Sequence, residues 1–307
     1  MKKLTILFIT KPMQHHIERS TYYLGKELEK FSNLTYHHVD GNLPDIIRQM
    51  SIKPDFILFN DLKPDYCPWM RNVDQVKIPK GTLVHDLHYR IPRRKRMYQK
   101  DQIPHLFVQY REAFCKWFPE FVDQMIWLPH HVPAEIYRDY SFEKDIDILM
   151  MGSLIPHLYP LRLRMFQKLK LHPGFKYFDH PGYKGIPADN RYVTGPRYAQ
   201  TMNRAKIFLT CDSIYKFPVL KYYEALACRT LLLASGSAEL KDLGFIDKET
   251  YVEVNETDFY EKIMFYLKNE SERNRIALNG MKLVQQKHTT QIRAKELLAH
   301  IQQIVKR

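Results

Sequence analysis

The sequence has little cysteine and little glycine. Its four cysteines, at positions 67, 115, 211 and 228, include no pair with C-x-x-C spacing, so we expect small buried apolar residues in a reducing compartment. With 11 glycines among 307 residues, collagen-like and low-complexity segments are excluded. No apolar run approaches the roughly 20 residues that span a bilayer, and the first residues lack a signal-peptide cleavage site. We therefore expect a cytoplasmic protein.

Motifs of several common enzyme classes are missing as well. The chain has no G-x-S-x-G, no G-x-x-x-x-G-K-[ST] and no G-x-G-x-x-G after its first apolar run. These absences argue against nucleophile-elbow hydrolases, P-loop enzymes and the usual dinucleotide fingerprint. A helical H-E-x-x-H is also absent, and the spacing of His85 and His88 on a strand does not favour a metal pair. We expect no metal site.

Positive charge is abundant. Lys and Arg number 47 against 34 Asp and Glu, which gives a formal net charge of +13. Such a balance favours an anionic partner, whether a nucleotide, a nucleic acid, an acidic glycan or a membrane surface. With 45% hydrophobic and 13% aromatic residues, the chain can bury a core, and its length is typical of two domains or one large one.

Apolar runs and helix-periodic stretches alternate along the whole chain. The first run, Leu4–Thr10, is typical of a strand buried on both faces of a parallel sheet, and a helical pattern follows at 15–31. The alternation restarts near 145. We therefore predict an α/β protein with two doubly wound parallel-sheet, Rossmann-like domains, residues 1–138 and 139–307, which face a cleft. We expect the last helix to pack back on the first domain. Further strands are predicted at 34–39, 56–59, 82–84, 107–108, 125–128, 145–151, 206–210, 230–234 and 251–254, and further helices at 43–50, 160–171, 257–269, 271–286 and 290–306.

The segment 206–236 carries the most chemistry. A buried strand ends in a polar loop, and a helix begins near Pro218, in whose first turn the missing N–H of proline costs nothing. The free N–H groups of such a helix start bind phosphate well, and Lys216 and Lys221 add positive charge. Glu224 lies on the same helix, where its carboxylate either accepts hydrogen bonds from ribose hydroxyls or is solvated on an amphipathic face.

Within this segment, Tyr223-Glu-Ala-Leu-Ala-Cys228 matches a signature of one enzyme family. It resembles the carboxyl-terminal domain of GT-B glycosyltransferases, in particular group-1-like transferases that include the spore-maturation CgeB-type proteins. Asp147-Ile-Leu-Met-Met-Gly-Ser153 and the closing segment from His288 agree with the resemblance, which covers about 145–300. Arg229 stands where the family usually has glycine.

The resemblance implies a metal-independent transferase without a cofactor, whose co-substrate is a nucleotide-sugar, with a UDP-sugar such as UDP-glucose favoured. Glu224 would bind the ribose. Gly152 and Ser153 would approach the diphosphate, with Arg162, or alternatively Arg164, as the charge partner. Lys216 occupies a position where many relatives have a sugar-binding glutamate, and it would instead neutralise the diphosphate together with the helix start at Val219, Leu220 and Lys221. The implied acceptor is a hydroxyl group in a cell-surface or spore-coat glycan pathway.

The first half offers candidates for the acceptor side. The segment His85–His88 ends a predicted strand, so Asp86 and His88 would share one face of it while His85 points away. Asp86 and His88 would act as the base for the acceptor hydroxyl, or either would cap a loop or satisfy backbone groups. His15 and His16 follow the first strand and are candidates for acceptor binding. The run Tyr89–Lys100 has six basic residues in twelve and no acidic one; it is either a solvated charge run or, through Arg93 and Arg94, an anchor for an anionic acceptor, for DNA or for a membrane surface.

Two alternative functions remain open from sequence. The high positive charge also fits a glucosyltransferase that acts on modified DNA bases, as in some phages. The departures at Lys216 and Arg229 fit a non-catalytic nucleotide-sugar-binding protein with a decayed site. The basic segment further predicts peripheral attachment to the inner membrane face, and the oligomeric state is left open.

Overall fold

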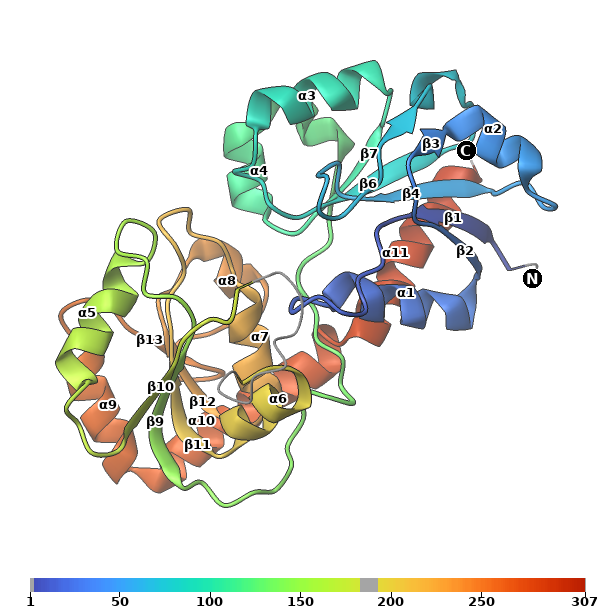
Figure 1. The fold of residues 1–307 in the computed structure, drawn as a ribbon. Coiled ribbons are helices and arrows are strands. Elements are labelled where there is room, and N and C mark those ends of the chain that lie inside the picture. Colours follow the sequence, from blue (N-terminus) through green and yellow to red (C-terminus); the bar gives the residue numbers. More distant parts are fainter. Residues whose placement is uncertain (1–2, 183–192, 307) are drawn as a thin grey trace. The chain divides into compact units, whose positions relative to one another are not determined.

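A computed structural model describes residues 3–182 and 193–306 (Figure 1). The chain divides into two compact units, which we call the amino-terminal unit (Met1–Pro129 with Thr290–Arg307) and the second unit (His130–Thr289). The division after Pro129 lies a few residues before the expected boundary at 138, and the last helix belongs to the amino-terminal unit.

The amino-terminal unit contains a six-stranded parallel sheet with the strand order β2-β1-β4-β6-β7-β8. Strands β1, β4 and β6 are buried along their whole length, as the inner strands of parallel sheets are. From β1 the chain adds β2 on one side of the sheet and β4 and the later strands on the other, so the strand order reverses between β1 and β4. The strands are β1 (Thr5–Ile9), β2 (Asn33–His37), β4 (Phe56–Asn60), β6 (Lys80–Val84), β7 (His105–Val108) and β8 (Met125–Trp127), with a separate parallel pair β3 (Gly41–Asn42) and β5 (Met70–Arg71).

Helices cover this sheet, and α1 and α11 pack together although they are far apart in sequence (Figure 1). Their apolar faces meet the strands in one core, to which Leu24, Leu28, Leu297 and Ile301 contribute. Helix α1 begins at Ser20, five residues after the expected start. The helices are α1 (Ser20–Phe31), α2 (Leu43–Gln49), α3 (Ile91–Lys100), α4 (Arg111–Trp117) and α11 (Thr290–Val305), with short 3-10 turns η1 (Val73–Gln75) and η2 (Pro119–Gln124).

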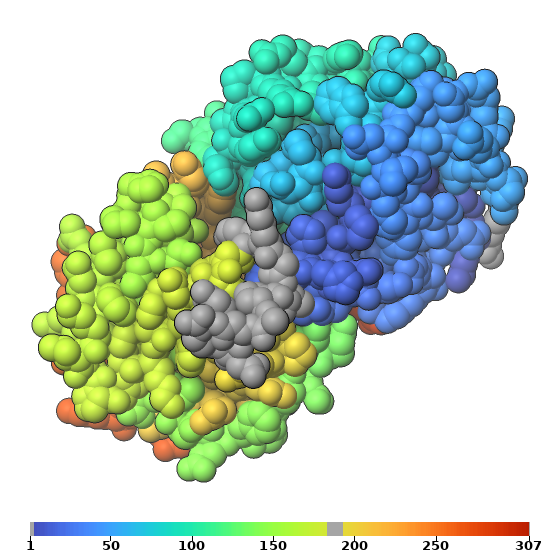
Figure 2. All heavy atoms as spheres, in the orientation of Figure 1, coloured from blue at the N-terminus to red at the C-terminus, as the bar shows by residue number. Residues whose placement is uncertain are grey.

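The second unit contains a five-stranded parallel sheet with the order β10-β9-β11-β12-β13. The strand order reverses between β9 and β11, because β10 is added on one side of β9 and the later strands on the other. The strands are β9 (Ile146–Met151), β10 (Phe175–Phe178), β11 (Ala205–Leu209), β12 (Leu231–Ala234) and β13 (Val252–Glu253), and the helices are α5 (Pro160–Leu169), α6 (Gly195–Asn203), α7 (Leu220–Ala227), α8 (Ala238–Asp242), α9 (Phe259–Lys268) and α10 (Glu270–Lys287). Figure 2 shows the heavy atoms as spheres in the orientation of Figure 1.

Helix α7 is held closely against α10. A Cβ atom added to Gly280 of α10 would lie 2.5 Å from the backbone oxygen of Thr250 and would also collide with Leu226 of α7. Glycine therefore permits this close approach. Helix α7 begins at Leu220 after the N-cap residue Val219, so Pro218 precedes the helix and does not occupy its first turn as expected. Glu224 consequently lies about one turn into the helix.

Candidate functional site

Gly152 follows β9 at the edge of the second sheet where the strand order reverses, which is where open α/β sheets bind ligands. Its φ of +119° is readily adopted only by glycine. An added Cβ would lie 2.7 Å from Lys221 Nζ and 3.5 Å from Arg162 Nη1. Two cationic side chains thus converge on the backbone of Gly152.

Arg162 of α5 fastens the ends of β9 and β11 together. Its side chain is buried, its Nη1 donates to the carbonyl of Ser153 at 3.1 Å, and its Nη2 donates to the carbonyl of Cys211 at 2.9 Å. The guanidinium also stacks over the ring of Tyr159, 3.9 Å from the centroid. These partners are neutral groups, so they hold the guanidinium of Arg162 in place without cancelling its charge.

Lys221 lies in the first turn of α7 and is partly buried. With the residues of 3–182 and 193–306, its amine forms no hydrogen bond or ion pair. Burial and the neighbouring charge of Arg162 lower the pKa of Lys221 to about 8, although the charge of Glu224 opposes that shift. The amine is therefore mostly charged at pH 7, close to a second cation and to the amino end of a helix. Such a set of donors is suited to a polyanion.

Glu224 is buried, and its Oε2 accepts a hydrogen bond from the hydroxyl of Tyr198 at 3.2 Å. Burial raises the pKa of Tyr198 and of Tyr137 well above the usual range, and the charge of Glu224 adds to both shifts. The two phenols therefore stay protonated and serve as donors to the carboxylate. A carboxylate has about four acceptor positions, so its chemistry suits both phenol and ribose hydroxyls.

Lys216 is directed elsewhere. It has a left-handed φ of +59°, its side chain is 67% exposed, and its amine pairs with Asp212 Oδ2 at 3.7 Å. Asp212 is buried at the end of β11, and Ser235 Oγ donates to its Oδ1 at 2.7 Å. Burial raises the pKa of Asp212, although Ser235 and Lys216 oppose the shift. Sequence reasoning missed Asp212; its position in the polar loop that follows a buried strand was the available signal.

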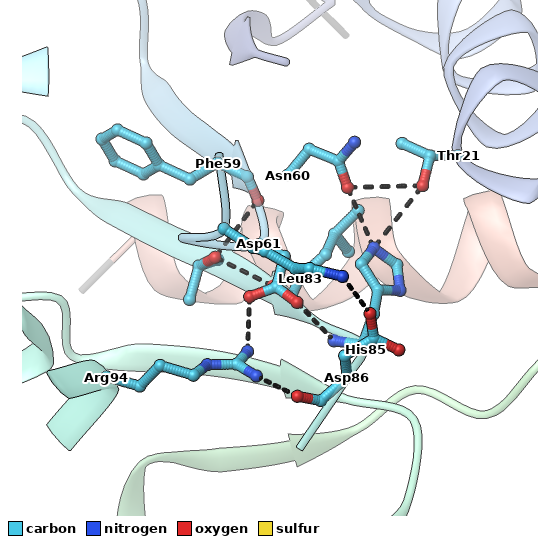
Figure 3. A network of polar contacts seen from close by, with 10 residues as sticks. Thr21, Phe59, Asn60, Asp61, Leu83, His85, Asp86 and Arg94 are labelled. Atoms are coloured by element: carbon cyan, nitrogen blue, oxygen red, sulfur yellow. Dashed lines mark hydrogen bonds and ion pairs between the residues drawn. The ribbon is translucent and has the colours of Figure 1, made fainter. Parts of the chain in front are cut away.

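In the amino-terminal unit, β6 ends at Val84, so Asp86 and His88 lie in the following loop and the expected strand alternation does not apply to them. His85, which was expected to point away from the site, joins a network at the ends of β4 and β6 (Figure 3). Its Nε2 lies 2.9 Å from Asn60 Oδ1 and 3.5 Å from the hydroxyl of Thr21. The position of His85 directly after the strand was the signal for it.

Arg94 is not at the surface, which corrects the expectation that it binds an acceptor. The basic run forms α3, and Arg94 points into the unit with 1% of its side chain exposed. Its Nη2 pairs with the fully buried Asp61, and its Nη1 donates to the carbonyl of Asp86 at 2.6 Å (Figure 3). The other oxygen of Asp61 accepts from the backbone N–H of His85 at 3.2 Å. This buried pair fixes the loop that carries Asp86.

Asp86 forms an ion pair with Lys63, with 2.7 Å between Oδ2 and Nζ. Burial alone would raise the pKa of Asp86, but the hydrogen bond and charge of Lys63 lower it. Burial lowers the pKa of His88, as do the charges of Lys63 and Arg94, against the opposing effect of Asp86. Both groups are therefore in their proton-accepting forms at neutral pH.

The other acceptor candidates lie on the surface. His15 is exposed in the turn between β1 and α1, with its Nε2 3.2 Å from the amide nitrogen of Gln14, and the N–H of His16 donates to the carbonyl of Met13. Arg93 stacks over the ring of Trp69, 5.8 Å from the centroid. In the described ranges, no cluster of His, Cys, Asp and Glu could hold a metal, and no helix is long and apolar enough to cross a bilayer.

Comparisons with known proteins address the fold of the chain and the family of its second half. Residues 162–299 match the family model described as glycosyl transferase-like. A search of the curated proteins found no match. Among solved structures, sucrose-phosphate synthase from Thermosynechococcus elongatus superposes with a TM-score of 0.69 at 12% identity, covering 99% of this chain and 100% of the other. A glycosyltransferase from Rickettsia africae gives 0.64 at 12%, covering 100% of both chains. HepE of Anabaena, solved with UDP and glucose, gives 0.65 at 11%, covering 98% and 100%.

The predicted fold is therefore confirmed: both units are Rossmann-like, with parallel sheets, and the chain matches GT-B structures along its length. The family match at 162–299 agrees with the predicted enzyme class, glycosyltransferase. The chain therefore has the GT-B fold, and its residues 162–299 match the glycosyl transferase-like family model.

Proposed function

We propose that this protein transfers a sugar from a nucleoside diphosphate donor to an acceptor hydroxyl, and that the donor is a UDP-sugar such as UDP-glucose. The proposal rests on the position of Lys221 Nζ and Arg162 close to Gly152. Positive charge lies there at the start of a helix, and the absence of a side chain on Gly152 lets a phosphate approach the backbone. The complexes of HepE with UDP and with UDP-glucose support the choice of nucleotide.

Different residues of the second unit bind the diphosphate and the ribose of the donor. Lys221, Arg162 and the N–H groups at Val219 and Leu220 face the diphosphate, with Gly152 and Ser153 beside it. Glu224 accepts the ribose hydroxyls. Lys216 is exposed and paired with Asp212, so it acts on the diphosphate only through its positive charge at longer range. Because negative charge grows on the diphosphate as the glycosidic bond breaks, fixed cations here stabilise the transition state more than the ground state.

The acceptor side is assigned to the amino-terminal unit. Asp86 or His88 accepts the proton of the acceptor hydroxyl as its oxygen bonds to the sugar carbon and the nucleoside diphosphate leaves. His15, His16 and Arg93 lie on the acceptor's approach. The proposed acceptor belongs to a cell-surface or spore-coat glycan pathway, as in CgeB-type proteins. The proposal also includes peripheral attachment to the inner membrane face through α3.

Calorimetric titration of UDP, GDP, ADP and CDP tests the donor site. We expect UDP to bind most tightly, and Lys221→Met to weaken it about tenfold or more, since a charge-assisted contact to phosphate is worth about 1.5–3 kcal/mol. Lys241→Met is the matched control, because Lys241 is exposed on α8 of the same unit. Equal affinity in the Lys221 variant would contradict the assignment. Release of UDP from UDP-glucose then separates an enzyme from a non-catalytic binding protein.

A second candidate, transfer to modified bases in DNA, is favoured by the net charge of +13. It predicts duplex binding that weakens steeply with salt, with a slope set by the number of phosphates contacted. Part of the basic run is already engaged inside the amino-terminal unit, since Arg94 pairs with Asp61 and Lys95 with Glu120. Weak binding to duplex DNA at low salt would therefore leave the glycan acceptor as the sole candidate.

A further inference from the structure

The amino-terminal unit has a shallow pocket of about 130 Å³ between α3 and the segment from Leu62 to Val73. Apolar side chains, including Phe59, Met97 and Ile103, form part of its lining. Ligand pockets for drug-sized molecules run from roughly 300 to 1,000 Å³, so this one has room for a single small ring.

Trp69 gives the pocket an exposed aromatic wall. Its side chain is 48% exposed, although large aromatic groups are usually buried. The indole is nevertheless held in place, because the backbone N–H of Trp69 donates to Asp40 Oδ1 at 2.8 Å and the guanidinium of Arg93 packs against the ring. A fixed, exposed indole beside a polar rim offers a flat apolar surface, on which the C–H face of a sugar ring stacks well.

The charges around the pocket balance. Among the lining residues, the charges of Lys11 and Arg93 are matched in number by Asp40 and Asp101. The third cation, Lys63, is already paired with Asp86. This local neutrality contrasts with the net charge of +13 for the whole chain. It disfavours an anionic ligand, and the carboxylates of Asp40 and Asp101 are suitable acceptors for hydroxyl groups.

Lys63 connects the pocket to the proposed chemistry, because it lines the pocket and its amine lies 2.7 Å from Asp86 Oδ2. We propose that this pocket binds a neutral pyranose ring of the acceptor, stacked on Trp69, so that a neighbouring hydroxyl approaches Asp86. The inference rests on the proposed function and deepens it: the acceptor is a neutral sugar, not an acidic glycan.

Tryptophan fluorescence tests the site directly. The probes are the methyl pyranosides of glucose, galactose and mannose, with glucuronate and glucose 6-phosphate as anionic counterparts. We expect at least one neutral glycoside to change the emission saturably, and Trp69→Ala to weaken that response at least about tenfold. Trp117→Phe is the control: it removes an indole of α4 outside the pocket and should leave the response intact.

Titration of UDP into the same variants separates the two proposals. Trp69→Ala should bind UDP like the wild type, which also shows that the variant is folded. UDP binding by the wild type without a response to any neutral glycoside would overturn the acceptor pocket and leave the donor site standing. Tighter binding of an anionic probe, or a response that survives Trp69→Ala, would overturn it as well. Failure of the wild type to bind UDP would instead refute the proposed function.

Discussion

Breaking the buried pair between Arg94 and Asp61 should destabilise the amino-terminal unit strongly. The two side chains are 1% and 0% exposed, so neither charge gains solvation from water when its partner is removed. Arg94→Met keeps most of the apolar volume but leaves the Asp61 carboxylate with the N–H of His85, and it frees the carbonyl of Asp86. Removal of one partner of a buried pair typically costs about 3–5 kcal/mol, and we expect a loss in this range.

Urea unfolding followed by tryptophan fluorescence measures this loss selectively. All three tryptophans, Trp69, Trp117 and Trp127, lie in the amino-terminal unit, so the signal reports that unit even if the second unit unfolds separately. The control is the double variant Asp61→Asn with Arg94→Met, which removes both charges and should be more stable than Arg94→Met alone. A loss below about 1 kcal/mol for Arg94→Met, or a double variant less stable than the single one, would refute the reasoning.

Three further predictions concern the second unit. Gly280→Ala should lower the free energy of unfolding by about 1–3 kcal/mol, because the new methyl group meets the oxygen of Thr250. Gly25→Ala in α1, where the obstacle is a movable tyrosine hydroxyl, should cost less in urea unfolding followed by circular dichroism, and equal costs would contradict this. Arg229 has a left-handed φ of +51°. Arg229→Val and Arg229→Gly lose the same ion pair, so they differ mainly in the strain of the left-handed backbone. The valine variant should be less stable than the glycine variant by about 1–2 kcal/mol in urea unfolding. Equal stability of the two variants would show that this backbone is not strained. With the pKa of Lys221 at about 8, its amine loses its proton between pH 7 and 9, and UDP affinity in calorimetry should fall about tenfold. Lys221→Met should not show this fall, and a fall that persists in that variant would assign the pH dependence to another group.

Much of the fold follows from local patterns in the sequence. The continuous apolar runs at β1, β4, β9 and β11 predict buried parallel strands, and the helical periodicity of α10 and α11 gives their bounds to within a residue or two. The strands β3 and β5 have only two residues each, which is too short for a period to register. Helix α3 is not predicted from the sequence, because its many basic residues resemble a solvated charge run and only Arg94 and Tyr98 are buried on its inward face.

The candidate site is less accessible to sequence reasoning. Lys221 and Glu224 follow from the pattern of a helix start, whereas Gly152 and Arg162 follow only from a resemblance. The structure brings Gly152, Arg162 and Lys221 together. The pair of Asp61 and Arg94 joins residues 33 apart, and nothing in the local pattern distinguishes a buried arginine from its exposed neighbours. The role of His85 was missed because the strand was extended past Val84, which reversed the expected direction of the side chains that follow.

Glycine at position 229 is usual in the family that the sequence resembles, and the structure shows why. Arg229, the second residue after α7, has a positive φ, and its backbone N–H donates to the carbonyl of Leu226 at 3.0 Å to end the helix. Arginine accepts this strained backbone, and its side chain gains an ion pair with Asp139 at 2.9 Å. The departure therefore leaves the helix end intact, and it is not evidence of a decayed site.

Binding of UDP to the wild type and to Lys221→Met, measured side by side by calorimetry at pH 7, tests the central claim most directly. The account predicts saturable binding of one UDP per chain to the wild type and an affinity at least about tenfold weaker in the variant. Lys241→Met should match the wild type. If UDP and the other nucleoside diphosphates fail to bind the wild type, or if Lys221→Met binds UDP equally well, the assignment of the donor site is contradicted.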